Sequence, residues 1–148
     1  MRSEQERMIG ALLRIPFEAT VAQIAADYAG AGFADLRPPH FTVFQHLPPG
    51  GARATDLAEQ AHLTKQYIGT LVAYLEGRGY VARVPDPADG RASLIQLTDR
   101  GRAAAAAARA SLWRLEAEWA ALLGGDELEQ LRALLRRLVT LVEGGRDR

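Results

Sequence analysis

The chain has 148 residues, of which 48% are hydrophobic and 24% charged, and its formal net charge is zero. This length and composition predict one globular domain, or one compact unit with a dimerising extension, and exclude a disordered chain. The absence of cysteine excludes disulfides, thiolate metal sites and cysteine redox switches. No apolar run approaches the ~18 residues of a membrane span, and the N-terminus is charged rather than signal-like. We therefore expect a cytoplasmic protein with no membrane partner.

The N-terminal region predicts a helix with an apolar face. Ser3–Glu6 has the pattern of a capping box, which predicts a helix start. Pro16 lacks a backbone N–H and is predicted to kink or break that helix near Ile15. Beyond the proline, apolar residues at helical spacing predict a face that is either core or interface: Phe17, Val21, Ile24 and Tyr28.

A second, shorter helix is predicted between two proline-rich segments. Arg37-Pro38-Pro39 ends anything helical before it, and Pro48–Gly51 has the composition of a loop. The intervening residues 39–47 predict a helix whose buried side carries Phe41, Phe44 and Leu47.

Residues 55–76 predict two helices joined by a tight turn. Thr64 is a favourable N-cap for the second helix, which the segment Gly77–Gly79 ends. One side of that helix is an apolar stripe of Ile68, Leu71, Val72 and Leu75. The opposite side carries small or hydrogen-bonding residues, namely Lys65, Gln66, Gly69, Thr70 and Ala73, flanked by Tyr67 and Tyr74. Such a side allows close approach to DNA bases, although an ordinary solvated helix has the same composition.

Residues 80–97 predict a β-hairpin whose tip, Pro85–Arg91, holds proline, glycine and aspartate at turn positions. An arginine on a protruding tip can enter the minor groove of DNA, so Arg91 is a candidate contact. We expect the Asp89 carboxylate to hold the Arg91 guanidinium by a charge-assisted hydrogen bond. An ordinary hairpin with a surface ion pair is the alternative. Helix, turn, helix and hairpin in this order predict a winged helix-turn-helix.

The C-terminal third predicts two further helices. Thr98 caps a helix that runs to Leu123, and about 25 residues at ~1.5 Å each give a rod of ~37 Å. Asp126–Glu129 has a second capping-box pattern. The last helix has a broad apolar band made of Leu128, Leu131, Leu134, Leu135, Leu138, Val139, Leu141 and Val142. A single-chain helical bundle and a dimer could each cover this band, and we favour the dimer.

Together these segments resemble the MarR family of winged helix-turn-helix transcriptional regulators. The resemblance rests on Asp86-Pro87-x-Asp89-x-Arg91 followed by Leu97-Thr98 and a long helix, on Leu57-Ala58, and on Leu75-Glu76-x-Arg78-Gly79-Tyr-Val81. It covers nearly the whole chain. The chain departs from the family pattern at three positions, where two arginines and a glycine are usual: Gly90 in the wing, Thr70 in the second helix and His62 in the turn. The first two departures lower the expected number of phosphate and base contacts.

The resemblance implies a mainly α fold with a small β-wing and a single MarR-like unit over residues 1–148. Residues 36–102 would form the winged helix-turn-helix, flanked by dimerisation helices in residues 1–35 and 103–148. The implied function is a dimeric DNA-binding regulator, most simply a repressor, on a near-palindromic site in double-stranded DNA. The expected DNA contacts are Thr64, Lys65, Gln66, Tyr67, Thr70, Arg83, Asp89 and Arg91.

The resemblance also implies that a small aromatic or phenolic ligand releases the protein from DNA. Residues compatible with such a pocket are Phe17, Val21, Ile24, Tyr28, His40, Phe41, Phe44, Arg109 and Trp113. The alternative is that these aromatic residues fill the core.

Two other function classes have less support. An enzyme is disfavoured because His40, His46 and His62 lack metal-ligand spacing and no phosphate-binding glycine loop or nucleophile motif is present. We therefore expect no catalytic residues, no metal and no cofactor. A winged-helix module that binds protein through Tyr67 and Tyr74, with weak or no DNA binding, remains the alternative.

Overall fold

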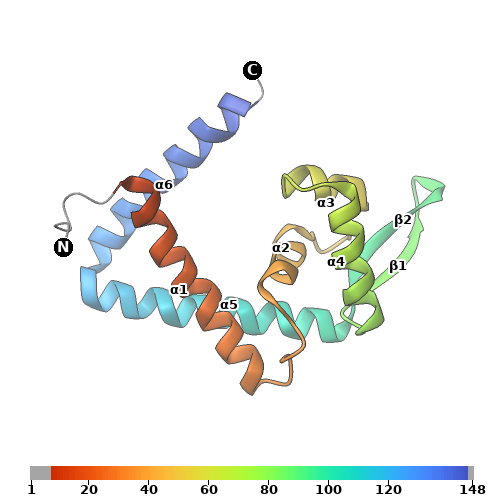
Figure 1. Cartoon of the computed structure of the whole chain (residues 1–148), viewed down its shortest axis with the longest axis horizontal. Helices are drawn as coiled ribbons and strands as arrows, with labels where there is room; N and C mark the ends of the chain where they lie inside the picture. The colour runs from red at the N-terminus through yellow and green to blue at the C-terminus, as the bar shows by residue number, and fades with distance from the viewer. Residues whose placement is uncertain (1–7, 147–148) are drawn as a thin grey trace. The chain divides into compact units, whose positions relative to one another are not determined.

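The computed structural model describes residues 8–146, and Figure 1 shows that they form helices and one small β-hairpin. The chain divides into two compact units, Met1–Ser111 and Leu112–Arg148, and each is described by itself. Along the chain the elements are α1 (Ile9–Gly30), α2 (Pro38–His46), α3 (Ala54–Gln60), α4 (Lys65–Gly77), β1 (Val81–Asp86), β2 (Asp89–Leu97), α5 (Asp99–Leu123) and α6 (Gly125–Arg146). The predicted mainly α fold with a β-wing is confirmed.

Helix α1 is continuous through Pro16, so the predicted break is wrong. Proline removes only its own N–H from the helical ladder, and the bonds of the neighbouring turns remain. Ile24 and Tyr28 are the buried residues of α1, and the Tyr28 hydroxyl donates a 2.8 Å hydrogen bond to the Ala104 carbonyl of α5. The predicted capping box at Ser3–Glu6 lies outside the described residues.

The N-terminal half of α1 is exposed and mostly apolar. The sequence analysis had expected no segment of this kind that could span a membrane. The helix is 22 residues long, and an 18-residue stretch of it has a mean hydropathy of 1.3, so it is long and apolar enough to cross a membrane by length and composition. Its outward apolar side chains include Ile9 and Phe17, which are 68% and 66% exposed. Phe17 lies on the same helical face as Ile24 and Tyr28, as the spacing predicts, but only the C-terminal part of that face is buried.

Helix α2 begins at Pro38 and ends at His46, one residue earlier at each end than predicted. Its buried residues are His40 and Val43, with Leu47 buried just beyond its end. The predicted buried pair, Phe41 and Phe44, is only partly covered. A nine-residue helix has few turns, so a small error in its phase exchanges which residues face the core.

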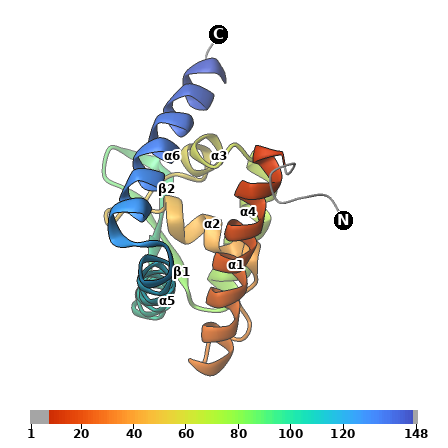
Figure 2. The same ribbon diagram turned by 90° about the vertical axis from the view of Figure 1, so that its left-hand side faces the viewer.

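The core of the first unit lies between α2, α3, α4 and the hairpin, which cluster together in both views (Figures 1 and 2). Its most completely buried apolar side chains include Tyr28, Val43, Leu57, Ile68, Val72, Leu75, Tyr80 and Ile95. Burying one such side chain contributes about 1.5–3 kcal/mol. The four apolar residues predicted for the second helix of the motif are all buried, which fixes the rotation of α4 about its axis.

The turn between α3 and α4 accommodates His62 where the family usually has glycine. This residue has φ = 54°, in the left-handed region that favours glycine. The His62 N–H donates to the Glu59 carbonyl, and the Leu63 N–H donates to the Ala58 carbonyl. These bonds close the turn, so a histidine occupies a position whose backbone suits the usual glycine.

The wing is an antiparallel hairpin in which Val81 pairs with Leu97 and Pro85 pairs with Ser93. The register shifts between Pro85 and Asp86, where the tip begins. Ala52 pairs with Ile95 on the other side of β2, so the loop before α3 adds a short third segment to the sheet. The wing is thereby tied to the helix-turn-helix at its base.

Helix α5 begins as predicted, because the Thr98 hydroxyl accepts a 3.1 Å hydrogen bond from the Gly101 N–H. Helix α6 begins at Gly125, one residue before the predicted cap, so Asp126 lies in its first turn. A carboxylate there still favours the helix because it faces the positive end of the helix dipole. Within the second unit, Arg132 bridges Glu116 of α5 and Glu129 of α6 at 2.8 and 3.0 Å.

The apolar band of α6 is exposed in the single chain. Leu128 is buried and Leu135 is partly covered, but the other residues of the band are 38% exposed or more, namely Leu131, Leu134, Leu138, Val139, Leu141 and Val142. Exposed apolar side chains that continue along several turns of one helix indicate an interaction surface.

Replacing Tyr28 by phenylalanine tests how α1 packs on α5. We expect a loss of about 1 kcal/mol in the free energy of unfolding, the net contribution of one buried neutral hydrogen bond. Thermal unfolding at fixed protein concentration measures the change. Tyr67→Phe is the matched control, because the Tyr67 side chain is 41% exposed. Equal midpoints for Tyr28→Phe and the unmodified protein would contradict this packing.

Candidate nucleic-acid interface

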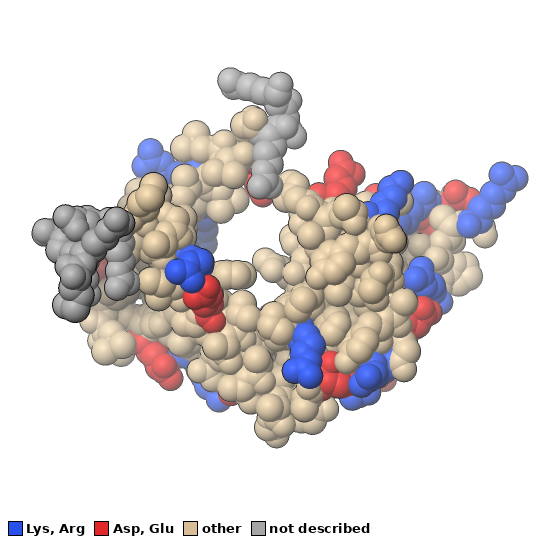
Figure 3. Space-filling view, in the orientation of Figure 1, with Lys and Arg blue, Asp and Glu red and all other residues tan. Residues whose placement is uncertain are grey.

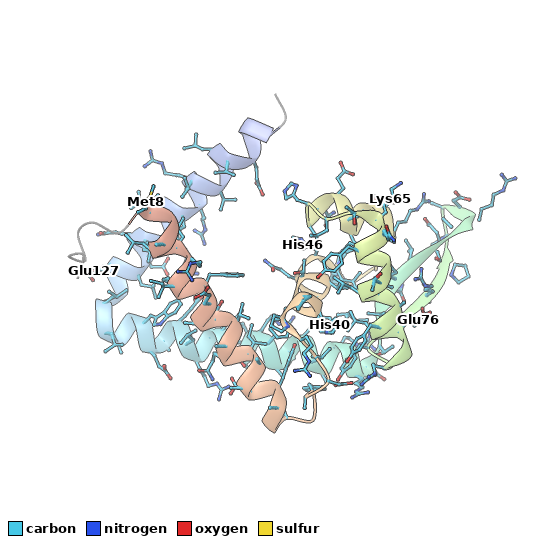
Figure 4. All side chains as sticks on the ribbon, in the orientation of Figure 1. Met8, His40, His46, Lys65, Glu76 and Glu127 are labelled. Carbon is cyan, nitrogen blue, oxygen red and sulfur yellow. The ribbon has the colours of Figure 1, made fainter. Side chains whose placement is uncertain are left out.

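The outward side of α4 is the first part of the candidate interface. Thr64 caps the helix, its hydroxyl accepting a 3.1 Å hydrogen bond from the Tyr67 N–H, as predicted. Lys65, Gln66, Tyr67 and Thr70 are all exposed. Lys65 lies at the first turn of the helix and Glu76 at its far end (Figure 4). The predicted contacts of this helix therefore lie on one accessible surface at its N-terminal half.

The wing tip is the second part. Arg91 is exposed, and a basic side chain projects from the end of the hairpin in Figure 3. The Asp89 carboxylate accepts a 3.0 Å hydrogen bond from the Arg91 backbone N–H, not from its guanidinium, so the predicted ion pair is wrong. An aspartate side chain is short and readily bonds the backbone two residues on. Asp89 therefore shapes the turn, and within residues 8–146 the Arg91 guanidinium has no ion-pair partner.

An ion pair that the sequence analysis missed holds the wing near its tip. Arg53, the residue before α3, donates a 2.7 Å hydrogen bond from Nε to Asp86 Oδ2, and its Nη2 atom lies 2.5 Å from the same oxygen. Asp86 also accepts a 2.9 Å hydrogen bond from the Ala88 N–H. The Ala88 N–H and the Arg53 guanidinium together hold the pKa of the Asp86 carboxyl below its usual range. The first helix of the motif and the wing are therefore linked through a charge-assisted contact to one carboxylate oxygen.

Arg83, also predicted to contact DNA, lies on β1 and pairs with Glu76 of α4 at 3.2 Å. Both side chains are about 40% exposed. An exposed pair of this kind contributes at most about 1 kcal/mol, so a DNA phosphate can compete with Glu76 for the guanidinium.

Asp35, in the loop between α1 and α2, connects the C-terminal end of α4 to the start of the wing. Its backbone carbonyl accepts a 2.6 Å hydrogen bond from the Tyr74 hydroxyl. Its carboxylate accepts another, also 2.6 Å, from the hydroxyl of the fully buried Tyr80. These contacts position the end of the candidate recognition helix, α4.

Two arginines complete the surroundings of Asp35. Arg78 and Arg100 approach its Oδ2 atom at 3.5 and 3.7 Å, and the Arg100 guanidinium lies over the Tyr80 ring at 4.3 Å. Burial raises the pKa of the Asp35 carboxyl, but the Tyr80 hydrogen bond and the two arginines outweigh it and lower that pKa. Burial and the bond to Asp35 raise the pKa of Tyr80 to about 12.

Tyr74 is occupied within the fold, which weakens the alternative of a protein-binding module. The His40 ring stacks on Tyr74 at 4.4 Å, and the Arg78 guanidinium lies 4.7 Å from the Tyr74 ring centre. His40 Nδ1 accepts a hydrogen bond from the Arg37 N–H, and burial lowers the pKa of His40. Figure 4 labels His40, which lies on α2 and faces α4 through this stack. His40 is therefore held within the fold through its ring and its Nδ1 atom.

The residues predicted to line a ligand pocket divide into three groups. Ile24, Tyr28 and His40 are buried, and Val21, Phe41 and Phe44 are partly covered. Tyr28 and Phe41 meet edge to face at 5.3 Å, so these two members of the set are brought together, whereas Phe44 approaches Tyr80, outside the set, at 6.1 Å. Phe17 and Arg109 are exposed, and Trp113, in the second unit, is 69% exposed.

The Asp35–Tyr80 contact generates a stability prediction. Asp35→Ala leaves the buried Tyr80 hydroxyl without its acceptor, which we expect to cost about 1–3 kcal/mol of unfolding free energy. The same change in a Tyr80→Phe background should cost less, because no hydroxyl remains unpaired. Chemical denaturation of the four proteins of this cycle measures the coupling. Additive effects would contradict it.

Asp35→Asn is the control for charge, since asparagine still offers an oxygen to Tyr80. A carboxyl whose pKa is lowered by folding contributes stability that is present above its unfolded pKa of about 3.9. That contribution is lost as the pH falls through the lower folded pKa. The unfolding free energy of the Asp35→Asn variant should therefore depend less on pH in this acidic range. If the unfolding free energies of the variant and the unmodified protein change identically with pH, Arg78 and Arg100 do not stabilise the Asp35 charge.

Comparisons with known proteins agree with this architecture. Residues 34–92 match the MarR family. The transcriptional regulator HosA of Escherichia coli O111:H- is 32% identical over 106 residues, which cover 71% of this chain and 78% of HosA. The HTH-type transcriptional repressor Rv2887 of Mycobacterium tuberculosis is 29% identical over 131 residues, 88% of this chain and 87% of the relative.

Two solved structures extend the likeness to nearly the whole chain. The transcriptional repressor CouR, bound to a 23-mer DNA duplex, has a TM-score of 0.74 and 27% identity, covering 93% of this chain and 96% of CouR. Rv2887 in complex with salicylic acid has a TM-score of 0.65 and 29% identity, covering 90% and 97%. The shared sequence over two thirds of the chain and the shared winged helix-turn-helix lead to one conclusion: the chain belongs to the MarR family of transcriptional regulators.

Proposed function

We propose that this regulator is a cytoplasmic homodimer that binds a near-palindromic site in double-stranded DNA, represses transcription there, and is released by a small aromatic or phenolic ligand. Two exposed features support DNA binding by this protein. One is the outer side of α4, which begins with Lys65, and the other is the wing, where Asp89 bonds the Arg91 backbone and leaves its guanidinium accessible. CouR, which shares this fold, is bound to a DNA duplex, and this supports the proposal.

The two parts of the interface suit different grooves. Helix α4 would enter the major groove by its N-terminal half, with Thr64, Gln66, Tyr67 and Thr70 toward the bases and Lys65 toward a phosphate. Arg91 would enter the adjacent minor groove, where its planar guanidinium meets the strongest negative potential. Two copies of α4 in a dimer would contact half-sites about one helical turn apart.

We assign dimerisation to the N- and C-terminal helices, in residues 1–35 and 103–148, and DNA binding to residues 36–102. The exposed apolar side chains of α1 and of α6 need a partner surface, and a second copy supplies one. A bilayer suits α1 poorly, because Arg14 and Glu18 form a 2.6 Å ion pair near the middle of the helix. An obligate dimer in the cytoplasm accounts for both features.

The proposed effector is a small aromatic molecule with an acidic or phenolic group. Rv2887 in complex with salicylic acid is the relative that supports this class. In the first unit, Val21, Phe41 and Phe44 offer partly covered apolar surface, and His40 and Arg109 are the candidates to orient an acidic group. A ligand that binds better to one spacing of the two α4 helices would lower DNA affinity by that difference in binding free energy.

Arg91→Ala tests the wing contact. We expect a loss of about 1–3 kcal/mol in binding free energy, largest on A·T-rich flanks where the minor groove is narrow. Fluorescence anisotropy with flank variants of one duplex measures it. Arg91→Lys keeps the charge and should lose mainly the flank preference. Unchanged affinity of Arg91→Ala on every flank would refute the wing assignment.

Lys65→Ala is the companion variant for the phosphate contact. If the Lys65 ammonium meets one phosphate, its removal should lower the slope of log affinity against log salt by about one unit, with little change in sequence preference.

Sedimentation at micromolar concentration tests the dimer, and we expect no monomer of the unmodified protein. Changing Leu131 and Leu135 together to aspartate should give unfolded or aggregated protein, because the charges would face the partner copy. Thr140→Asp is the control on α6, since Thr140 lies on the side opposite the leucine band. A monomeric unmodified protein, or a soluble monomer from the double variant, would contradict an obligate dimer.

A panel of aromatic carboxylates and phenols tests the effector. We expect at least one member to quench the fluorescence of Trp113 or Trp119 and to weaken DNA binding over the same concentration range. Aliphatic carboxylates of similar size are the control for charge alone. If no aromatic compound perturbs either signal at millimolar concentration, on the order of the weakest useful affinity, the effector proposal fails.

A further inference from the structure

The stripe of α4 directly opposite its buried side is formed by Gln66, Thr70 and Ala73. A helix advances by 3.6 residues per turn, so positions i, i+4 and i+7 lie along one line. All three residues are exposed, whereas the buried side carries Ile68, Leu71, Val72 and Leu75. This stripe is therefore the part of α4 that reaches furthest into a major groove. Gln66 and Thr70 lie in its N-terminal half, where recognition helices contact base edges.

The hydrogen bonding of Thr70 determines what it offers to a base. Its hydroxyl donates a 3.1 Å hydrogen bond to the Gln66 carbonyl, one turn back in the same helix. The hydroxyl has then used its only donor and can still accept, and the methyl group is the apolar part left for a partner. In the described part of the chain the Gln66 amide group makes no side-chain hydrogen bond, so its donor and acceptor are both free.

These two groups match the edges of an A·T base pair. A glutamine amide can pair with the N6 and N7 atoms of adenine, and a methyl group packs on the thymine 5-methyl. Gln66 and Thr70 are four residues apart, about 6 Å along the helix, which spans roughly two base-pair rises of ~3.4 Å.

The usual partners of guanine are missing from the stripe. Guanine O6 and N7 are most often bound by arginine or lysine. Lys65 is the only cationic residue within α4, and it lies beside the stripe rather than on it. Arg78, just beyond the helix, is held by Asp35 and by the Tyr74 ring.

We propose that α4 selects A·T base pairs in each half-site, with Gln66 on an adenine and the Thr70 methyl on a thymine 5-methyl group, and that it makes no guanine contact from this stripe. This inference rests on the proposed DNA-binding function and adds the base class that the function leaves open.

The test begins with selection of binding sites by the full-length protein from a random-sequence duplex library. We expect half-sites dominated by A·T pairs at two adjacent or nearly adjacent positions. Each thymine of a selected duplex is then replaced by deoxyuridine, which lacks only the 5-methyl group. One thymine per half-site should be sensitive, with an affinity loss of about fourfold, the equivalent of one buried methyl group.

Thr70→Ser identifies the residue that makes this contact, because it removes the methyl and keeps the hydroxyl. On the thymine duplex it should lose about the same fourfold, and on the deoxyuridine duplex it should lose nothing further. Thr140→Ser is the matched control, since Thr140 is exposed and donates the same kind of hydrogen bond, to the Arg136 carbonyl of α6. It should remain as sensitive to deoxyuridine as the unmodified protein.

Thr70→Arg provides a second arm, since it adds a two-pronged donor to the stripe. Selection with this variant should move one half-site position toward guanine.

Three results would overturn the inference while leaving DNA binding intact: half-sites with guanine at the contacted positions, equal affinity for thymine and deoxyuridine duplexes, or an undiminished deoxyuridine effect in Thr70→Ser. Failure to enrich any sequence would instead refute the proposed function, and this inference with it.

Discussion

The burial of one apolar side of α4 is the constraint on which the rest of the candidate interface depends. Ile68, Val72 and Leu75 are completely buried, and rotating the helix would expose them at a cost of about 1.5–3 kcal/mol each. The opposite side, with Gln66 and Thr70, is thereby fixed toward solvent. The surface that can meet DNA is therefore a consequence of core packing.

Long-range polar contacts then set the position of α4 and of the wing. The Asp35 carboxylate accepts a hydrogen bond from the Tyr80 hydroxyl, so the loop after α1 contacts the start of the wing. Arg53 forms an ion pair with Asp86, so the residue before α3 contacts the wing near its tip. Both contacts involve a carboxylate whose pKa is lowered, and both leave the Arg91 guanidinium uncommitted. A chain with no net charge can still present Lys65 and Arg91 to DNA, because Arg53, Arg78 and Arg100 are paired with carboxylates within the fold.

Local patterns were sufficient to predict the fold, but long-range and competing contacts were not. The apolar spacing of α4, the Thr64 and Thr98 caps and the wing turn all act within a few residues, so the sequence shows them directly. Arg53 and Asp86 are 33 residues apart and Asp35 and Tyr80 are 45 apart, and no local pattern links either pair. The Asp89 prediction failed for a different reason, because the nearby Arg91 N–H competes successfully with the guanidinium. The prediction at Pro16 failed because proline disfavours helices in general, yet α1 continues through it.

Binding of the full-length protein to the DNA that flanks its own coding sequence tests the central claim most directly. A gel-shift titration against that duplex, with a shuffled duplex of the same length and composition as competitor, separates specific from non-specific association. The account predicts a discrete complex that forms while the shuffled duplex remains free. Equal retention of the two duplexes, or none of either, would contradict the assignment of α4 and the wing as a sequence-specific DNA interface.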